Sequence, residues 1–331
     1  MKASVIGGGT WGSAFAIHLG RLNIKTQLWI REPDIFEEAQ KCRENIVFLP
    51  GFVFPPAVSF FNELDKALNS TEIVFIAVPS KYCRQIYNQI APFLSSKQIL
   101  VSLTKGIEEG SLKRMSEIME EEFSSSFSPK IAVLSGPSFA KEVVEKHPTT
   151  AVLASKDLNL ARKVQHFISR LYFRTYASDD LIGVELCGAL KNIIAIGAGI
   201  SDSLQFGDNS RAGLITRGLA EMTRLGLKLG AKSQTFAGLA GIGDLVLTCT
   251  GKLSRNRYVG YQIGRGRSLE EITSKMKMVA EGITTTLSAH QLAKRENVEM
   301  PISEQVYQIL YKKKDPKKIL QKLLSRKLKD E

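Results

Sequence analysis

Residues 3–12 read ASVIGGGTWG, and this stretch decides the fold. A short apolar run ends in glycines, and residues 10–21 continue with the pattern of a helix. Gly7, Gly9 and Gly12 occupy the three glycine positions of a GxGxxG motif. Between a strand and a helix, such glycines permit a tight turn, a close backbone approach to a pyrophosphate, and close helix–strand packing. The N–H groups at the helix start attract the anion. We therefore expect a dinucleotide-binding loop.

The rest of the first half alternates short apolar runs with helical patterns. The runs that we expect to form further strands are residues 27–30, 73–78, 99–103, 131–134 and 150–153. Strands without polar alternation, linked by helices, are typical of a parallel sheet covered on both faces. After residue 178 the strand signals fade, and helical patterns continue to the end. We predict an α/β fold in which a doubly wound, mostly parallel sheet in residues 1–182 precedes an all-α domain in residues 183–331.

Composition limits the classes of partner. The formal net charge of +12 is compatible with nucleic acid, an anionic membrane or small anions. Much of the excess lies in residues 312–329, where apolar side chains interleave at helical spacing at positions 319, 320, 323 and 324. A final amphipathic helix docked on the body fits this pattern better than nucleic-acid or membrane contact. We expect no nucleic-acid partner and no stable membrane insertion, since no stretch of about 18 apolar residues lacks a charge.

The four cysteines bear on the cellular compartment. Cys42, Cys83, Cys187 and Cys249 are scattered, and no two of them form a CxxC pair. This spacing is typical of reduced thiols in a cytosolic enzyme rather than of a metal site or a disulfide framework. We therefore expect a cytoplasmic protein that needs no metal.

The end of the second predicted strand bears on the cofactor. In a dinucleotide-binding fold this point faces the adenosine ribose, where an acid binds the 2′-hydroxyl of NAD and an arginine suits the 2′-phosphate of NADP. The chain has Arg31 followed by Glu32 here. We expect NADP(H) as the favoured cofactor and NAD(H) as the second choice.

Lys191 is a single charge within the apolar, small-residue stretch 186–199. On a helix, the side chains one turn away from it are apolar or small and cannot pair with an ammonium. Burial without a partner would lower the pKa of this lysine and suit it to proton transfer near neutral pH. The alternative is a helix-edge lysine whose amine reaches water.

Two segments at the carboxyl ends of predicted strands point to anion binding. Lys105 follows the run 99–103, at the edge where ligands bind in open α/β sheets. Residues 136–140, GPSFA, follow another strand, and the hydroxyl of Ser138 with nearby backbone amides could hold a small oxyanion. Taken singly, Lys105 would be interpreted as a solvated loop lysine and residues 136–140 as an ordinary turn.

Two further segments in the helical half carry polar groups suited to a phosphate. Residues 254–257, SRNR, offer a hydroxyl, guanidinium groups and an amide at the start of a helical pattern. A capped helix with exposed arginines explains them equally well. Asp244 ends the sequence GIGD in a turn before an apolar run. It could orient Lys191, accept a hydrogen bond from a substrate hydroxyl, or cap a helix.

Taken together, these residues resemble the NAD(P)-dependent glycerol-3-phosphate dehydrogenase family, bacterial type. The resemblance covers nearly the whole chain in colinear blocks. The blocks are residues 7–12, 45–51, 105–108, 136–142, 185–199, 207–209, 216–218, 241–249, 254–256 and 280–282. The resemblance implies a Rossmann-like domain followed by an all-helical domain, in agreement with the patterns above.

The resemblance also implies residue roles. Lys191 is implied as the proton donor and acceptor. Substrate contacts are implied for Lys105, Gly136, Ser138, Lys191, Asp244, Ser254, Arg255 and Asn256. Cofactor contacts, beyond the glycine loop itself, are implied for Thr10, Trp11, Arg31, Lys105, Ala140, Arg255, Val279 and Glu281.

The activity implied is reversible hydride transfer between a nicotinamide and dihydroxyacetone phosphate, which forms sn-glycerol 3-phosphate for glycerophospholipid synthesis. We also expect a homodimer. One alternative is a two-domain dehydrogenase of the same architecture that acts on a β-hydroxyacid. Another is a non-catalytic redox-sensing module that binds a dinucleotide and uses the basic tail on nucleic acid or membrane.

Overall fold

The computed structural model describes residues 2–276 and 278–319. By its internal contacts the chain divides into a first unit, Met1–Lys105 with Lys113–Glu185, and a second unit, Gly106–Leu112 with Leu186–Glu331. The predicted domains 1–182 and 183–331 stay a prediction, because contact density does not test whether each part folds alone. The predicted basic helix at the C-terminus falls mainly in residues 320–331, outside the described residues.

The first unit is built on strands with helices between them. Its strands are β1 (Ala3–Ile6), β2 (Thr26–Trp29), β3 (Glu44–Asn45), β4 (Leu49–Val53), β5 (Val58–Phe61), β6 (Ile73–Ile76), β7 (Ile99–Ser102), β8 (Lys130–Ser135), β9 (Thr149–Ala154) and β10 (Phe173–Ser178). Its helices are α1 (Thr10–Arg21), α2 (Pro33–Cys42), α3 (Leu64–Leu68), η1 (Ser80–Tyr82), α4 (Cys83–Ile90), η2 (Ala91–Phe93), α5 (Met115–Phe123), α6 (Ala140–Val144) and α7 (Leu158–Ile168).

Eight of these strands form one sheet in the order β10-β9-β8-β7-β6-β1-β2-β5. Every neighbouring pair is parallel except β8 and β9, so β9 and β10 run against the other six strands. Residues 136–148 carry only the short helix α6 between β8 and β9, and the chain turns back instead of crossing over. The predicted doubly wound, mostly parallel sheet is confirmed.

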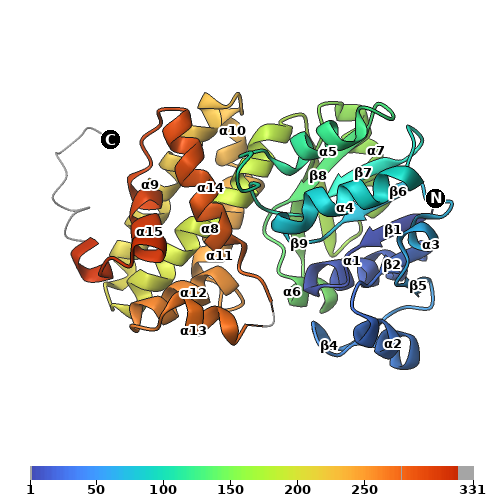
Figure 1. Ribbon diagram of the computed structural model, residues 1–331, viewed down its shortest axis with the longest axis horizontal. Coiled ribbons are helices and arrows are strands. Elements are labelled where there is room, and N and C mark those ends of the chain that lie inside the picture. The colour runs from blue at the N-terminus through green and yellow to red at the C-terminus, as the bar shows by residue number, and fades with distance from the viewer. Residues whose placement is uncertain (1, 277, 320–331) are drawn as a thin grey trace. The chain divides into compact units, whose positions relative to one another are not determined.

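The central strands are buried on both faces, which explains their unbroken apolar character. In β6, Ile73 and Phe75 pack into the cluster that includes α1, whereas Val74 and Ile76 pack into the cluster that includes α4 and α5. Figure 1 shows α1 and α4 on the sheet. Alternate residues of a strand point to opposite faces, so both sets must be apolar when helices cover both sides.

The glycine loop has the geometry that its sequence predicts. Gly7 directly follows β1 and has a φ of +121°, a conformation that side chains with a Cβ rarely adopt. A Cβ on Gly12 would lie 1.9 Å from the carbonyl oxygen of Gly7. Helix α1 therefore approaches the end of β1 too closely for any side chain at position 12.

From residue 186 on, the regular elements of the second unit are helices in its described residues. Its helices are α8 (Leu181–Ser203), α9 (Gly207–Lys228), α10 (Ser233–Phe236), η3 (Leu239–Gly243), α11 (Asp244–Thr250), α12 (Arg255–Gly264), α13 (Leu269–Ser274), α14 (Glu281–Arg295) and α15 (Pro301–Lys312). The predicted all-α C-terminal part is confirmed.

Helix α8 is the central apolar helix. It is long and apolar enough to cross a membrane by length and composition, but 89% of its most apolar window is buried within the fold. The core helix of a soluble protein passes the same test of length and composition. Helix α12 packs against α8 at very short range, since a Cβ on Gly260 would lie 1.9 Å from the carbonyl oxygen of Ile196.

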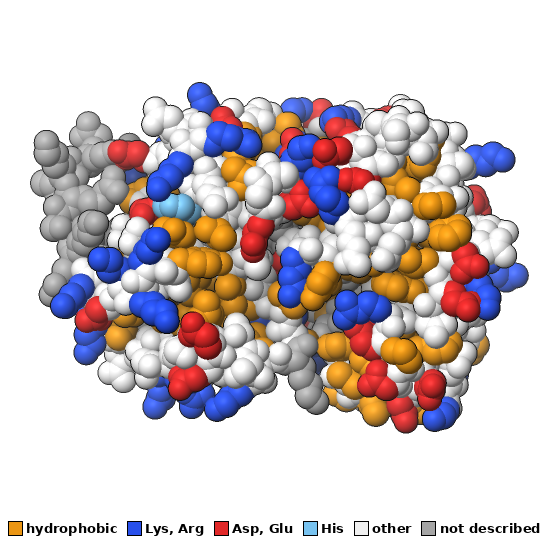
Figure 2. Space-filling model, in the orientation of Figure 1, with side chains coloured by type: hydrophobic (Ala, Val, Ile, Leu, Met, Phe, Trp, Pro, Cys, Tyr) orange, Lys and Arg blue, Asp and Glu red, His pale blue; other side chains and the backbone are white. Residues whose placement is uncertain are grey.

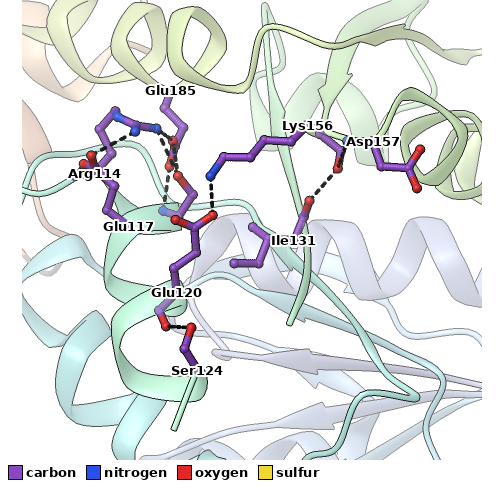
Figure 3. A network of polar contacts seen from close by, with 10 residues as sticks. Arg114, Glu117, Glu120, Ser124, Ile131, Lys156, Asp157 and Glu185 are labelled. Atoms are coloured by element: carbon purple, nitrogen blue, oxygen red, sulfur yellow. Dashed lines mark hydrogen bonds and ion pairs between the residues drawn. The ribbon is translucent and has the colours of Figure 1, made fainter. Parts of the chain in front are cut away.

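The start of α8 is anchored in the first unit by a buried polar network (Figure 3). The Glu185 carboxylate accepts hydrogen bonds from the backbone N–H of Ser116 at 2.8 Å, the Ser116 hydroxyl at 2.6 Å, and the Arg114 guanidinium. Burial raises the pKa of Glu185, while the Arg114 charge opposes that rise. Arg114 also pairs with Glu117 at 3.0 Å, so α5 and the first turn of α8 share one ionic cluster.

Surface charge is mixed on the face shown in Figure 2. Lys and Arg side chains are interspersed there with Asp and Glu side chains. Basic and acidic side chains are therefore intermixed on this face.

The cysteines are free thiols. Cys42 is exposed, and Cys83, Cys187 and Cys249 are buried.

Candidate active site

Most of the predicted cofactor residues lie in the first unit, and the glycine loop among them follows the carboxyl end of β1. Gly7, Gly9 and Gly12 form the turn into α1, with Gly9 at the position just before the helix. A Cβ on Gly9 would meet nothing within 4 Å, so the backbone here is open to a ligand. The first N–H groups of a helix have no partner within the helix, and α1 has no side-chain cap. This cradle fits a pyrophosphate.

Asn45 in β3 supports the same loop. Its Nδ2 donates to the carbonyl oxygen of Gly8 at 2.7 Å and to the hydroxyl of Ser13 at 2.9 Å, while its Oδ1 accepts from the N–H of Phe48. The residue is buried. Asn45 opens one of the blocks that resemble the family, but no local pattern predicted that it would hold the glycine loop.

The other predicted cofactor residues of the first unit have distinct surroundings. Thr10 and Trp11 begin α1, and Trp11 packs against Phe15 with ring centroids 5.9 Å apart. Arg31 follows β2 and is exposed, and its Nη2 lies 2.6 Å from Glu32 Oε1. Ala140 is the first residue of the short helix α6. The predicted contacts of these residues with a cofactor stay predictions.

Three predicted substrate residues of the first unit meet at one carbonyl group. Lys105 lies beyond β7, and its Nζ donates to the carbonyl oxygen of Gly136 at 3.1 Å. The Ser138 hydroxyl donates to the same oxygen at 2.9 Å. The parallel pairing of β7 and β8 brings these groups together at the carboxyl edge. An amine and a hydroxyl thus lie close to each other, as the sequence pattern predicts for an anion site.

The proton-transfer half of the predicted site lies in the second unit. Lys191 is 6% exposed, and its Nζ donates to Asp244 Oδ1 and, at 2.7 Å, to Thr248 Oγ1. The sequence left open whether a buried Lys191 would be unpaired or held by Asp244, and the structure pairs it with Asp244 from α11. A carboxylate in contact stabilises the charged ammonium.

Asp244 and Thr248 reach Lys191 because they share one face of α11. Residues four apart on a helix are neighbours. The Thr248 hydroxyl donates to the backbone carbonyl of Asp244 at 2.6 Å, so its oxygen is turned to accept from the lysine. The segment before Asp244 is a π-helical turn, η3, rather than the flexible turn expected from its glycines. Such turns recur at functional sites.

The predicted phosphate residues lie at the start of α12. The Ser254 hydroxyl caps the helix by accepting from the N–H of Arg257 at 3.2 Å. Asn256 is buried; its Nδ2 donates to Asn192 Oδ1 at 2.8 Å and its Oδ1 accepts from the N–H of Gly282 at 2.9 Å. Asn192 follows Lys191 in α8, so Asn256 ties α12 and α14 to the helix that carries the lysine.

Arg255 follows Ser254 at the start of α12 and is exposed. The surrounding protein still desolvates its guanidinium, which lowers the pKa of Arg255, and the Glu281 carboxylate opposes this. An arginine remains charged at neutral pH despite such a shift. Glu281 begins α14 and Val279, half-buried, lies two residues before it. A guanidinium beside a helix start suits a phosphate.

Sequence reasoning missed three polar residues of the second unit. Thr248 and Asn192 contact predicted site residues directly. Asp202 pairs with Arg257 at 2.7 Å and with Arg211 at 2.6 Å, and so anchors α12 to α8 and α9. The four-residue spacing from Asp244 could have indicated Thr248. No pattern in the sequence indicated Asp202.

Comparisons with known proteins identify the family of the chain. Residues 2–161 match the family model described as NAD-dependent glycerol-3-phosphate dehydrogenase N-terminus, and residues 180–321 match the model of the C-terminus. A protein of Syntrophobacter fumaroxidans named glycerol-3-phosphate dehydrogenase [NAD(P)+] is 47% identical over 99% of this chain and 96% of its own. A protein of the same name from a Geobacter species is 50% identical over 100% of this chain and 98% of its own.

A solved structure extends the likeness to three dimensions. The crystal structure of glycerol-3-phosphate dehydrogenase from Coxiella burnetii is 39% identical and covers 98% of this chain and 99% of its own, with a TM-score of 0.94. Both halves of the chain thus match the same kind of enzyme along their whole length. The chain belongs to the NAD-dependent glycerol-3-phosphate dehydrogenase family.

Proposed function

We propose that this chain catalyses the reversible reduction of dihydroxyacetone phosphate to sn-glycerol 3-phosphate with NADPH or NADH. The observation that carries the proposal is the buried Lys191, held by Asp244 and Thr248 in a chain that matches the family from end to end. The product would supply glycerophospholipid synthesis.

Lys191 is the proposed proton donor. A bound reduced nicotinamide supplies the hydride that adds to C2 of the ketone. Lys191 Nζ gives a proton to the C2 oxygen as negative charge develops there, and in the reverse direction it takes the proton back. After the transfer, the Asp244 carboxylate lies beside a neutral amine. Its negative charge favours reprotonation of Lys191 to the ammonium form. Thr248 holds the amine in one direction throughout.

Arg255 is the proposed phosphate anchor. Its guanidinium can bind two phosphate oxygens at once, and the accessible part of its surface leaves room for a ligand. Ser254 and Asn256 fix the helix start through their own hydrogen bonds. A phosphate held away from C2 orients the reacting carbon, which lowers the barrier without chemical participation.

Lys105 and Ser138 are proposed to bind substrate oxygens from the first unit. In the structure both donate to Gly136, and a substrate oxygen can replace that carbonyl as acceptor. We propose that the dinucleotide binds to the glycine loop and to Thr10, Trp11, Arg31, Lys105, Ala140, Arg255, Val279 and Glu281, with NADP(H) favoured over NAD(H).

The proposed setting is a cytoplasmic homodimer without a nucleic-acid partner. Free thiols support the compartment, because disulfides are rare in the reducing cytoplasm. Sedimentation of the purified chain measures the oligomeric state, and a monomer at micromolar concentration would contradict the dimer.

One assay tests the activity. The purified chain is mixed with dihydroxyacetone phosphate and either NADPH or NADH, and the loss of nicotinamide absorbance is followed. We expect turnover with both cofactors and a higher kcat/KM with NADPH. A 3-oxo acid serves as the comparison substrate. Turnover of the oxo acid without turnover of dihydroxyacetone phosphate would overturn the proposal.

A further inference from the structure

Two cations share one tyrosine ring near the glycine loop. The guanidinium carbon of Arg31 lies 5.5 Å from the centroid of the Tyr82 ring, and Lys81 Nζ lies 4.7 Å from it. Both distances are within the range of a cation–π contact. Lys81 is exposed and Tyr82 is half-buried. Two positive side chains are therefore gathered at one point of the surface.

The sheet places this pair beside the dinucleotide loop. Strand β1 pairs with β2 on one side and with β6 on the other, and Ile6 is level with Trp29 and Ile76. Arg31 follows β2, and η1, which carries Lys81, follows β6. All three strand ends therefore point to the same edge, with the glycine loop in the middle. In such folds this edge binds the adenosine half of a dinucleotide.

The charges at this point suit a doubly charged anion. Arg31 forms an exposed ion pair with Glu32. Such a pair contributes about 0–1 kcal/mol, so Arg31 can exchange Glu32 for another anion at little cost. Lys81 brings a second positive charge next to the same ring. The two cations also lower the pKa of Tyr82, with the hydrogen bond from Lys81 as the largest cause. A phosphate monoester carries about 1.5 to 2 negative charges at neutral pH, enough for both cations.

We propose that Lys81 is a second cation for the adenosine 2′-phosphate and that, with Arg31, it sets a preference for NADP(H) over NAD(H). Tyr82 keeps the two side chains together. The inference rests on the proposed function only in assuming that the loop binds a nicotinamide dinucleotide. It assigns specificity to a position after β6, whereas the usual determinant lies after β2.

Binding of small nucleotides tests the proposal without turnover. The probes are adenosine 2′,5′-bisphosphate and adenosine 5′-monophosphate, titrated by calorimetry into the wild type and Lys81→Gln. Loss of one charge-assisted contact should weaken the bisphosphate roughly ten-fold or more and leave the monophosphate nearly unchanged. Equal weakening of both probes, or of neither, would overturn the assignment.

Lys97→Gln is the matched control. Lys97 is exposed and lies just before β7, at the amino end of a parallel strand and so at the opposite edge of the sheet. The Lys97→Gln substitution removes one positive charge, as Lys81→Gln does, but leaves the proposed site unchanged. Both probes should bind it as they bind the wild type. A selective loss of bisphosphate binding in this control would attribute the effect to net charge and overturn the role of Lys81.

Steady-state kinetics separates this inference from the proposed function. In Lys81→Gln the KM for NADPH should rise roughly ten-fold, while the KM for NADH and both kcat values stay close to those of the wild type. If dihydroxyacetone phosphate is not turned over but the bisphosphate is bound selectively through Lys81, the proposed reaction fails and the assignment stands. If turnover is normal and the NADPH preference is unchanged in the variant, the assignment fails alone.

Discussion

Lys191 and Asp244 are 53 residues apart in the chain and form a buried ion pair. Removing either partner of such a pair leaves an uncompensated buried charge and destabilises the fold. The pairing therefore limits which variants can test catalysis. Arginine keeps the positive charge for Asp244 but does not release a proton at neutral pH, so Lys191→Arg separates proton transfer from stability.

We predict that Lys191→Arg lowers kcat by about 10²-fold or more, because the variant lacks a general acid. Dinucleotide binding, followed by fluorescence titration, should be retained. The smaller change Thr248→Val removes one acceptor of the lysine and should lower kcat roughly ten-fold. A Lys191→Arg enzyme with near-normal kcat would refute the proton-transfer role.

At the scale of elements, close helix packing positions the lysine. Helices α8 and α12 meet through Gly199 and Gly260, where a Cβ would lie 2.0 Å and 1.9 Å from backbone oxygens of the other helix. Neither backbone oxygen can move far without breaking its own helix. The short distance between the helices brings Asn256 within reach of Asn192, next to Lys191.

We predict that Gly260→Ala destabilises the chain by about 1–3 kcal/mol or more, because the added methyl group overlaps the carbonyl oxygen of Ile196. Gly213→Ala in α9 is the control, since its Cβ would meet nothing within 4 Å. Alanine inside a helix is favoured over glycine by about 0.5–1 kcal/mol, so this variant should be slightly stabilised. Urea unfolding measures both, and equal stabilities would contradict the packing argument.

At the scale of the whole molecule, two buried groups make the units respond to pH in opposite ways. Burial lowers the pKa of His18, in the first unit, to about 4 from 6.5. Below pH 6.5 His18 binds a proton in the unfolded chain, but in the folded chain it does so only near pH 4. The free energy of unfolding therefore falls as the pH is lowered from 6.5 towards 4. Burial raises the pKa of Glu221, in the second unit, to about 7 from 4.5. Above pH 4.5 the unfolded chain loses a proton that the folded chain keeps, so stability falls as the pH approaches 7.

We predict that the stability of the wild type relative to Glu221→Gln falls by up to about 3 kcal/mol between pH 4.5 and pH 7.5. Glu221 caps α15 through the N–H groups of Ile302 and Ser303, so the variant also changes the baseline, but that offset does not depend on pH. Urea unfolding at several pH values gives the difference. A constant difference across this range would show that Glu221 titrates normally in the folded chain.

Much of the fold could be predicted because its signals are local. The glycine loop, the helix of residues 10–21 and the fully apolar strands each lie within a few neighbouring residues, and the predicted helix matches α1. Predicted strand 27–30 lies one residue beyond β2. Strands β5 and β10 were missed, since their residues alternate between buried and exposed and lack the unbroken apolar run of a central strand.

The sequence by itself determined the family, the fold class and the candidate residues, because each rests on short motifs whose order along the chain can be read directly. Only the tertiary structure decided how those residues are paired. Asp244 and Thr248 meet Lys191, Asn45 holds the glycine loop, and Lys81 joins Arg31 at Tyr82. These contacts join residues distant in the chain, and their geometry depends on how helices and strands pack, which no local pattern encodes.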